Sequence, residues 1–198
     1  MQGLDCYIAL VKEMDVNGLL RVILFDKDGA YDFKRSEVTI SKEKFENGIK
    51  SKSIYPINYN IESDKGFRIK SDETIFKIVA SSVRKCLEEK IGTGTDLAGH
   101  CIEASSLIES ILKELGFDAK SIEGWCSYDD ECYGSDRPYD EHTWVECNGY
   151  YIDATADQFN PGMDIDNNFN KVIVHKGLIH NMSYEEPEYE DEDEDNEY

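Results

Sequence analysis

Short runs of strand-forming apolar residues fill the first seventy positions of the chain, and turn-forming segments separate them. Most of these turns combine an acidic residue or Asn with Gly, which is typical of connections between antiparallel strands. We therefore expect a β-rich region over residues 1–70. The predicted strands are 6–11, 19–25, 37–40, 54–60 and 66–69, and the predicted turns are 15–18, 26–29, 46–48 and 63–66.

The spacing of the apolar residues changes from Ser71 onward. Over residues 75–87 they recur at helical spacing, and Ser71 is placed to cap the N-terminus of the predicted helix. A second helix is predicted over residues 101–115, where a broad apolar stripe indicates deep burial and Gly116 marks the end. The segment 92–99 between the helices lacks the Lys-Ser or Lys-Thr of a phosphate-binding loop, so we expect a connector there.

Strand patterns return after the second helix. Two of the strands flank Asn148-Gly149, a pair of residues that favours a tight hairpin turn. The segment 127–141, just before the first of these two strands, is polar, acidic and irregular. Together with the helices, these strands predict an α+β fold. The predicted strands are 117–125, 142–146, 150–155 and 171–175.

The formal net charge of −21 is unevenly distributed. Ten of the 42 acidic side chains lie in residues 184–198, which contain no basic residue. Such a segment cannot bury enough apolar surface to fold, so we expect a disordered acidic tail. Its role is open between solubility, docking on a basic partner and mimicry of nucleic acid. The chain has no cluster of Lys and Arg, so we expect no nucleic-acid partner.

The cellular compartment is indicated by three features of the sequence. No apolar run approaches the roughly 20 residues that span a bilayer. The N-terminus lacks the basic and apolar segments of a signal peptide. The six cysteines are scattered, unlike those of a disulfide-stapled secreted domain. We therefore expect a cytoplasmic protein with no membrane partner.

Two segments raise the question of a bound metal. Cys126, Cys132, Cys147 and His142 are zinc-ligand types, but their spacing contains no tight Cys-x-x-Cys pair. The segment 26–29 superficially resembles the start of a calcium loop, yet it lacks the later acidic ligand at the required offset. We therefore expect no metal and no cofactor, with a zinc-stabilised interaction module as a minor alternative.

Cys101, His142 and Asp153, in this order along the chain, predict nucleophilic chemistry. Cys101 begins the second helix, where the helix dipole and unpaired N–H groups favour a thiolate. His142 could hold the thiol proton and later return it to a leaving group, while Asp153 could orient the imidazole. With Asn148-Gly149 as the central turn residues, His142 lies diagonally across from Asp153 on the same face of the hairpin. We therefore predict a Cys-His-Asp catalytic triad.

The segment from Gly99 to about Phe159 resembles the transglutaminase-like branch of the papain-like cysteine enzyme superfamily, of the bacterial and phage type. The matching motifs are Gly-His-Cys-Ile-Glu-Ala, Leu-Gly-Phe-Asp-Ala-Lys-Ser-Ile-Glu-Gly, His-Thr-Trp-Val-Glu, Gly-Tyr-Tyr-Ile-Asp-Ala-Thr and Asp-x-Thr-Ala-Asp-Gln-Phe. The resemblance implies a papain/transglutaminase-like core, in which the nucleophile helix packs on an antiparallel sheet. It also implies Cys101 as nucleophile, His142 as base and Asp153 as its orienting partner.

We accordingly expect three parts of the chain: the β-rich region 1–70, a transglutaminase-like catalytic core at 71–183, and the tail at 184–198. The expected activity is that of a cysteine-dependent hydrolase or acyltransferase, which acts on an amide bond through a thioester. A peptidase or amidase is favoured. The expected substrate is a peptide or protein, and the acidic surface favours a basic one.

Other parts of the predicted site follow from the same chemistry. The N–H of Cys101 is one expected oxyanion donor, and the second would come from Trp125 or the loop 94–99. Trp125 and Trp144 are the candidate substrate-binding residues. The alternative function is a catalytically silent binding protein, which would engage a basic partner through its acidic surface and tail.

Overall fold

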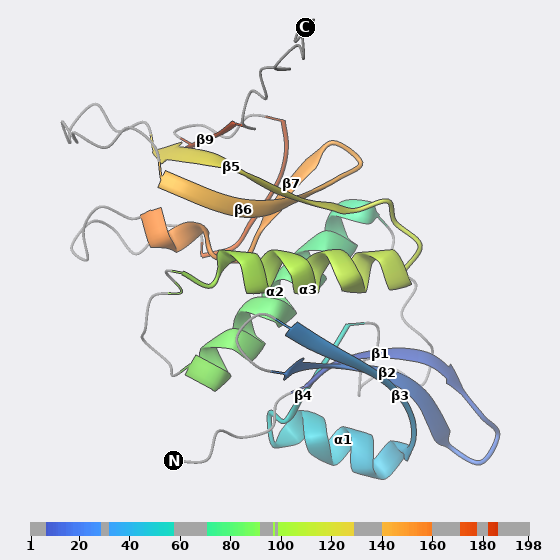
Figure 1. Cartoon of the computed structure of the whole chain (residues 1–198). Coiled ribbons are helices and arrows are strands. Elements are labelled where there is room, and N and C mark those ends of the chain that lie inside the picture. Colours follow the sequence, from blue (N-terminus) through green and yellow to red (C-terminus); the bar gives the residue numbers. More distant parts are fainter. Residues whose placement is uncertain are drawn as a thin grey trace, which may run out of the picture.

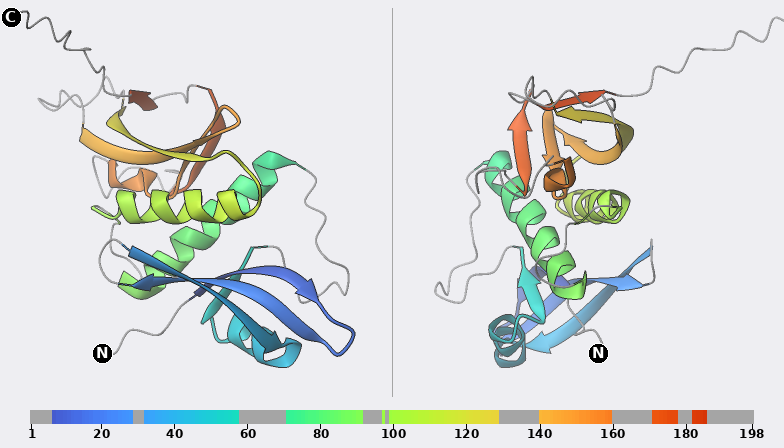
Figure 2. Two further views of the ribbon diagram at one scale, coloured as in Figure 1. Left: turned by 45° about the vertical axis from the view of Figure 1, so that its right-hand side comes forward. Right: turned by 90° about the vertical axis from the view of Figure 1, so that its left-hand side faces the viewer.

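Two long helices lie between two β-sheets (Figure 1). The helices are α2 (Asp72–Ile91) and α3 (Cys101–Glu114), and the fold class is α+β, as predicted. Two further views show α2 running obliquely past α3 from one sheet to the other (Figure 2). The computed structural model describes residues 7–28, 32–57, 71–91, 97, 99–128, 140–159, 171–177 and 182–185.

The N-terminal region forms a four-stranded sheet in the order β3-β2-β1-β4. Neighbouring strands are antiparallel except β4, which pairs with β1 in parallel. One face packs on the two long helices, and a short helix, α1 (Lys42–Lys50), contacts β3 and β4. The strands are β1 (Tyr7–Met14), β2 (Leu19–Asp28), β3 (Asp32–Ser41) and β4 (Ile54–Pro56).

Helix α1 corrects the prediction of a turn at 46–48. Ser41 caps this helix by accepting the Lys44 N–H, and Phe45 is fully buried in a small core under the sheet. Gly48 looks like a turn residue in the sequence, but it serves close packing. A Cβ atom at this position would lie 2.5 Å from Cδ1 of Ile54, so only glycine fits without a shift.

Two other expectations for this region changed. Residues 26–28 of the predicted turn 26–29 instead continue the pairing of β2 with β3, up to the pair Asp28 and Asp32, and Gly29 lies outside the described residues. Of the predicted strand 54–60, Ile54–Pro56 forms β4, and the Ile57 N–H still donates to the C=O of Ala9 on β1 at 2.9 Å. Residues 58–60, the predicted strand 66–69 and the turn 63–66 lie outside the described residues.

The second sheet has five strands in the order β8-β7-β6-β5-β9. The hairpin between β6 and β7 is confirmed: Cys147 pairs with Tyr150, and both Asn148 (φ 51°) and Gly149 (φ 75°) have positive φ. These values belong to a turn whose twist suits a two-residue hairpin. The strands are β5 (Lys120–Tyr128), β6 (Asp140–Cys147), β7 (Tyr150–Asp153), β8 (Ile173–Lys176) and β9 (Met182–Glu185).

Strand β9 was not predicted, and it contains the first two residues assigned to the acidic tail. It pairs with β5, with Tyr184 opposite Cys126 and Glu185 opposite Trp125. Main-chain hydrogen bonds at a sheet edge do not depend on apolar side chains, so composition alone could not reveal this strand. The remaining tail, 186–198, lies outside the described residues.

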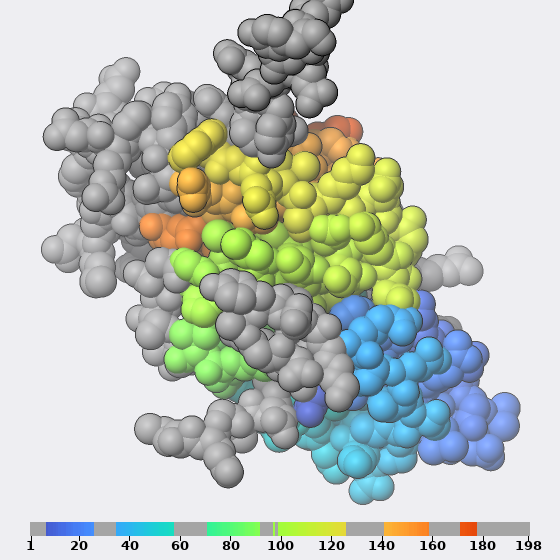
Figure 3. All heavy atoms as spheres, viewed as in Figure 1, coloured from blue at the N-terminus to red at the C-terminus, as the bar shows by residue number. Residues whose placement is uncertain are grey.

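One continuous core joins both sheets to the two long helices. Ile8 and Phe25 from the first sheet belong to the same buried cluster as Phe76 on α2, Ile108 on α3 and Ile152 on β7. One side of α3 remains visible at the surface between the sheets (Figure 3). No helix in the described part of the chain is long and apolar enough to cross a membrane.

Candidate active site

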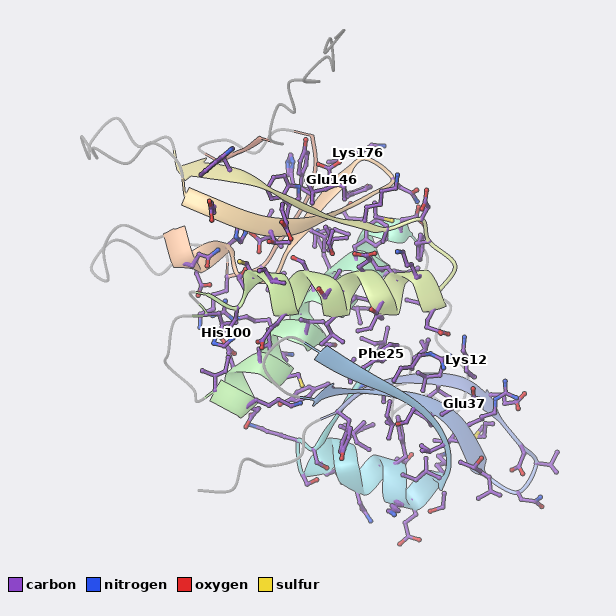
Figure 4. The ribbon with its side chains drawn as sticks, in the orientation of Figure 1. Lys12, Phe25, Glu37, His100, Glu146 and Lys176 are labelled. Carbon is purple, nitrogen blue, oxygen red and sulfur yellow. The ribbon has the colours of Figure 1, made fainter. Side chains whose placement is uncertain are left out.

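Cys101 is the first residue of α3 and lies partly buried at its N-terminus. Its sulfur accepts hydrogen bonds from the backbone N–H groups of Ile102 and Thr143, and it hydrogen-bonds with the His142 ring. The preceding residue, His100, is labelled at this end of the helix in Figure 4, and its Nδ1 lies 2.7 Å from a carboxylate oxygen of Glu103. His142 is therefore the imidazole that contacts the thiol.

The helix meets the sheet where strand β7 stops. The pairing of β6 with β7 extends only as far as Val145 with Ile152, and β7 ends one residue later. At Thr143, side chains of α3 take the place of β7 as partners of the β6 backbone. The Thr143 N–H donates to the sulfur of Cys101, and the Thr143 C=O accepts the Ser105 hydroxyl at 2.8 Å. Cys101 and Ser105 are one helical turn apart on the same face, so together they fix α3 against the strand that carries His142.

His142 and Asp153 form a buried pair. His142 is only 2% exposed, and its Nε2 lies 2.7 Å from Oδ2 of Asp153. The other carboxylate oxygen of Asp153 accepts the Thr155 backbone N–H at 2.7 Å and the Thr155 hydroxyl at 3.0 Å. Both carboxylate oxygens are thus bound, so the carboxylate holds the imidazole in a defined orientation with Nδ1 turned away from it.

The pKa values of the two reacting groups are shifted in opposite directions. Burial alone would lower the pKa of His142, but the charge and hydrogen bond of Asp153, with a contribution from Cys101, raise this pKa to about 9. Burial alone would raise the pKa of Cys101, but His142 and the two backbone N–H donors bring it below its usual value. Both shifts act in favour of a thiolate–imidazolium pair, and the two groups titrate as one coupled pair.

Gln158 completes the surroundings of the imidazole. It lies on a short 3₁₀-helix, η1 (Ala156–Phe159), and its Nε2 is 2.5 Å from Nδ1 of His142. When the imidazole is neutral and donates from Nε2 to Asp153, its Nδ1 accepts from this amide. Gln158 stands in the Asp-x-Thr-Ala-Asp-Gln-Phe motif, but we predicted no role for it. Its place in that motif was the sequence feature that could have indicated a role for it.

The packing of α3 along β5 bears on the position of Trp125. Helix α3 runs antiparallel to β5 (Figure 1), and Glu109 on α3 accepts the Ser121 N–H of β5 at 2.9 Å. From this contact Cys101 lies eight residues back along the helix, about 12 Å. Trp125 lies four residues further along the strand, about 13 Å, on the same face as Ser121. Trp125 is 40% exposed, so it is available for contact with a substrate.

The candidate role of Trp144 in substrate binding disagrees with its position. Its ring is fully buried, and its Nε1–H donates to Glu146 at 3.2 Å. The ring also stacks on His142 at a centroid distance of 6.3 Å. Trp144 therefore supports the imidazole from within the fold and presents no surface to a substrate. In the loop 94–99, the other candidate source of an oxyanion donor, only Leu97 and Gly99 are described.

The candidate zinc ligands are only partly visible. Within the described ranges, no group of three or more His, Cys, Asp or Glu side chains could hold a metal ion, and Cys132 is outside those ranges. Burial, followed by the charges of Asp72 and Asp118, raises the pKa of Cys147 to about 11. Cys147 is thus an inert thiol at neutral pH, in contrast to Cys101.

Comparisons with known proteins do not assign the chain to a family. No protein-family model matches it, and it has no match among curated proteins or solved structures. The case for a function therefore rests on the residues of this site.

Proposed function

We propose that this chain is a cysteine-dependent enzyme that cleaves or transfers an acyl group from an amide, with peptidase or amidase activity favoured. The observation that carries the proposal is the contact chain from Cys101 through His142 to Asp153. The cysteine lies at a helix N-terminus and the other two residues lie on adjacent strands. The motifs in 99–159 support a transglutaminase-like enzyme as the specific type.

In the first half of the reaction, the Cys101 thiolate attacks the carbonyl carbon of the amide. The negative charge that develops on the carbonyl oxygen is stabilised by the N–H of Cys101, a first-turn donor that has no partner within its helix. His142 then gives its Nδ1 proton to the amide nitrogen, and the carbon–nitrogen bond breaks. The amine leaves, and the acyl group remains on Cys101 as a thioester.

In the second half, neutral His142 accepts a proton from a water molecule as the water oxygen attacks the thioester carbon. The carbon–sulfur bond breaks, a carboxylic acid leaves, and the thiolate–imidazolium pair is restored. If an amine attacks in place of water, the same steps transfer the acyl group to that amine. The three residues serve hydrolysis and transfer equally.

The substrate that we favour is a basic peptide or protein. A net charge of −21 attracts cationic substrates over a range of about one Debye length, roughly 8 Å in physiological salt. Two apolar side chains are exposed, that of Ile102 next to Cys101 in the chain and that of Trp125 on β5, and they could contact an apolar part of the substrate.

The test combines reactivity with turnover. Alkylation of Cys101 by iodoacetamide is followed against pH by peptide mass spectrometry, in the parent protein and in His142→Ala. Cys86 and Cys147, both buried, report any loss of the fold within the same sample. The proposal predicts a Cys101 rate that persists well below pH 8 and falls in His142→Ala. It also predicts cleavage of members of a Lys- and Arg-rich peptide library that Cys101→Ala does not cleave. An ordinary thiol titration in both proteins would refute it.

The second candidate is a binding protein of the same fold without turnover, and the strongly acidic composition favours it. This function predicts an unreactive Cys101 and loss of binding to a basic partner when the tail is removed. Deletion of 186–198 is the suitable change, because it leaves β9 intact. Binding of polylysine by the parent protein and the deletion variant, in low and high salt, measures the effect. Equal binding by the two proteins would refute this candidate.

A further inference from the structure

A buried arginine on α2 contacts the segment that follows Asp153. The side chain of Arg84 is only 4% exposed. Its Nη1 donates to the C=O of Ala154 at 3.2 Å, and both of its terminal nitrogens donate to the carboxylate of Asp157, with Nη2 to Oδ2 at 2.7 Å. Its Nε donates to Glu88 at 2.8 Å. The guanidinium therefore joins one helix to two points of a short segment distant in sequence.

That segment, 153–158, contacts His142 at both of its ends. Asp153 binds Nε2 of the imidazole, and Gln158 lies against Nδ1. The two residues that Arg84 holds, Ala154 and Asp157, lie between these ends. The position of the segment relative to α2 therefore determines the position of both partners of the imidazole.

The chemistry of the contact suits a positioning role. Burial of a guanidinium is costly unless it is paired and its donors are used, and here Asp157 and Glu88 supply two carboxylates. The planar fork of arginine binds a carboxylate through two parallel hydrogen bonds, which fixes orientation as well as distance. Lysine could keep the charge but not this geometry. Sequence reasoning missed Arg84 because nothing in the helical pattern of α2 distinguishes it from a solvent-facing residue.

We propose that Arg84 is a positioning residue of the active site, which holds the segment 153–158 so that Asp153 and Gln158 stay in contact with His142. This inference rests on the proposed function of Cys101 and His142. Arg84 does not touch the reacting atoms, so its loss acts through the imidazole. A displaced Asp153 stabilises the imidazolium less, and the pKa of Cys101 then rises toward its ordinary value.

The sign of the effect separates positioning from charge. Removal of the positive charge at Arg84→Met and removal of the negative charge at Asp157→Ala would change a long-range field in opposite directions. Both changes release the same segment, so positioning predicts that both raise the pKa of Cys101. Each unit of that rise lowers the thiolate fraction tenfold at a pH well below the pKa.

The experiment measures the iodoacetamide alkylation rate of Cys101 from pH 5 to 10 in the full chain, by peptide mass spectrometry. The variants are Arg84→Met, Arg84→Lys, Asp157→Ala and His142→Ala. Arg21→Met is the matched control, since Arg21 is an arginine paired with Glu13 and Glu37 on the other sheet. We expect the rate at pH 6 to fall at least tenfold in Arg84→Met and in Asp157→Ala, by a smaller factor in Arg84→Lys, and not at all in Arg21→Met.

The possible failures are distinguishable. A parent protein without reactivity at low pH overturns the proposed function itself. A reactive parent with unchanged profiles in the Arg84 and Asp157 variants, with shifts of opposite sign in them, or with a fully active Arg84→Lys overturns the positioning role alone. If Arg84→Met does not fold, which reactive Cys86 and Cys147 would reveal, the folded Arg84→Lys and Asp157→Ala variants decide the question.

Discussion

Replacement of Asp153 by asparagine removes the charge that keeps His142 protonated. The pKa of His142 stands at about 9, against an ordinary value of 6.5, and Asp153 is the strongest influence in that direction. The difference corresponds to about 3 kcal/mol in favour of the imidazolium. Without the carboxylate, burial is opposed only by Cys101, and the pKa of His142 falls to its ordinary value or below.

The substitution also changes which ring nitrogen carries the proton. An asparagine amide facing Nε2 donates a hydrogen bond to it, so the single proton of the neutral ring moves to Nδ1. Nδ1 then presents an N–H to the sulfur where the base needs a lone pair. A Cys101 thiol with a pKa near 9 is only about 1% ionised at pH 7. We therefore expect the alkylation rate at pH 7 to fall by about ten- to a hundredfold, with the lower factor reflecting the greater nucleophilicity of the more basic thiolate.

The assay is the pH profile of Cys101 alkylation in the parent protein and Asp153→Asn. Asp15→Asn is the matched control, because Asp15 also accepts backbone N–H groups, from Asn17 and Leu19, at an exposed hairpin far from the site. The control should match the parent. If Asp153→Asn kept the parent's rate at pH 7 while Cys147 stayed unreactive, the assignment of Asp153 as the residue that sustains the imidazolium would be wrong.

Three further predictions follow from the same contacts. Gln158→Ala removes a donor that favours neutral His142, so the low-pH limb of the Cys101 alkylation profile should move to lower pH. The expected move is roughly half a unit to one unit, from a hydrogen bond of about 1 kcal/mol. A move to higher pH would contradict the assigned contact. Ser105→Ala leaves the buried C=O of Thr143 without its hydroxyl donor and should lower the free energy of unfolding, measured in urea, by about 1–3 kcal/mol. Alkylation of Cys101 should also become slower. An unchanged urea midpoint would argue against that bond. In Cys101→Ala, Asp153 still raises the pKa of His142, so the imidazolium should stabilise the fold fully below pH 6.5 and this contribution should be lost as the pH rises through the raised pKa. The parent should show a flatter profile because its thiol ionises in the fold. Urea titrations at several pH values in both proteins measure this, and identical slopes would contradict the coupling.

The parts of the structure that sequence could predict depend on local interactions. The turn at Asn148-Gly149 is set by two residues that adopt positive φ with little strain, and this turn fixes the register that brings His142 near Asp153. The cap at Ser71, whose hydroxyl accepts the Thr74 N–H at 3.3 Å, is equally local. The order of Cys101, His142 and Asp153 in the sequence, together with this turn, was therefore enough to predict the site.

The parts that escaped prediction depend on contacts between distant segments. Gly48 is a packing residue only because Ile54 comes back against it from β4. Arg84 is recognisable as part of the site only when α2 is seen beside Asp157. Trp144 looks like a substrate contact in the sequence, and only the folded sheet shows that its ring is covered.

The central claim is that Cys101 carries an acyl group during turnover, and direct detection of that thioester tests it. The protein is mixed with a Lys- and Arg-rich peptide library, quenched in acid after milliseconds to seconds, and digested for peptide mass spectrometry. The account predicts an acyl adduct on Cys101 that forms and decays in the parent protein, accumulates less in His142→Ala and is absent in Cys101→Ala, with Cys86 and Cys147 unmodified throughout. Cleavage of the library without any adduct on Cys101, or equal product from Cys101→Ala, would contradict it.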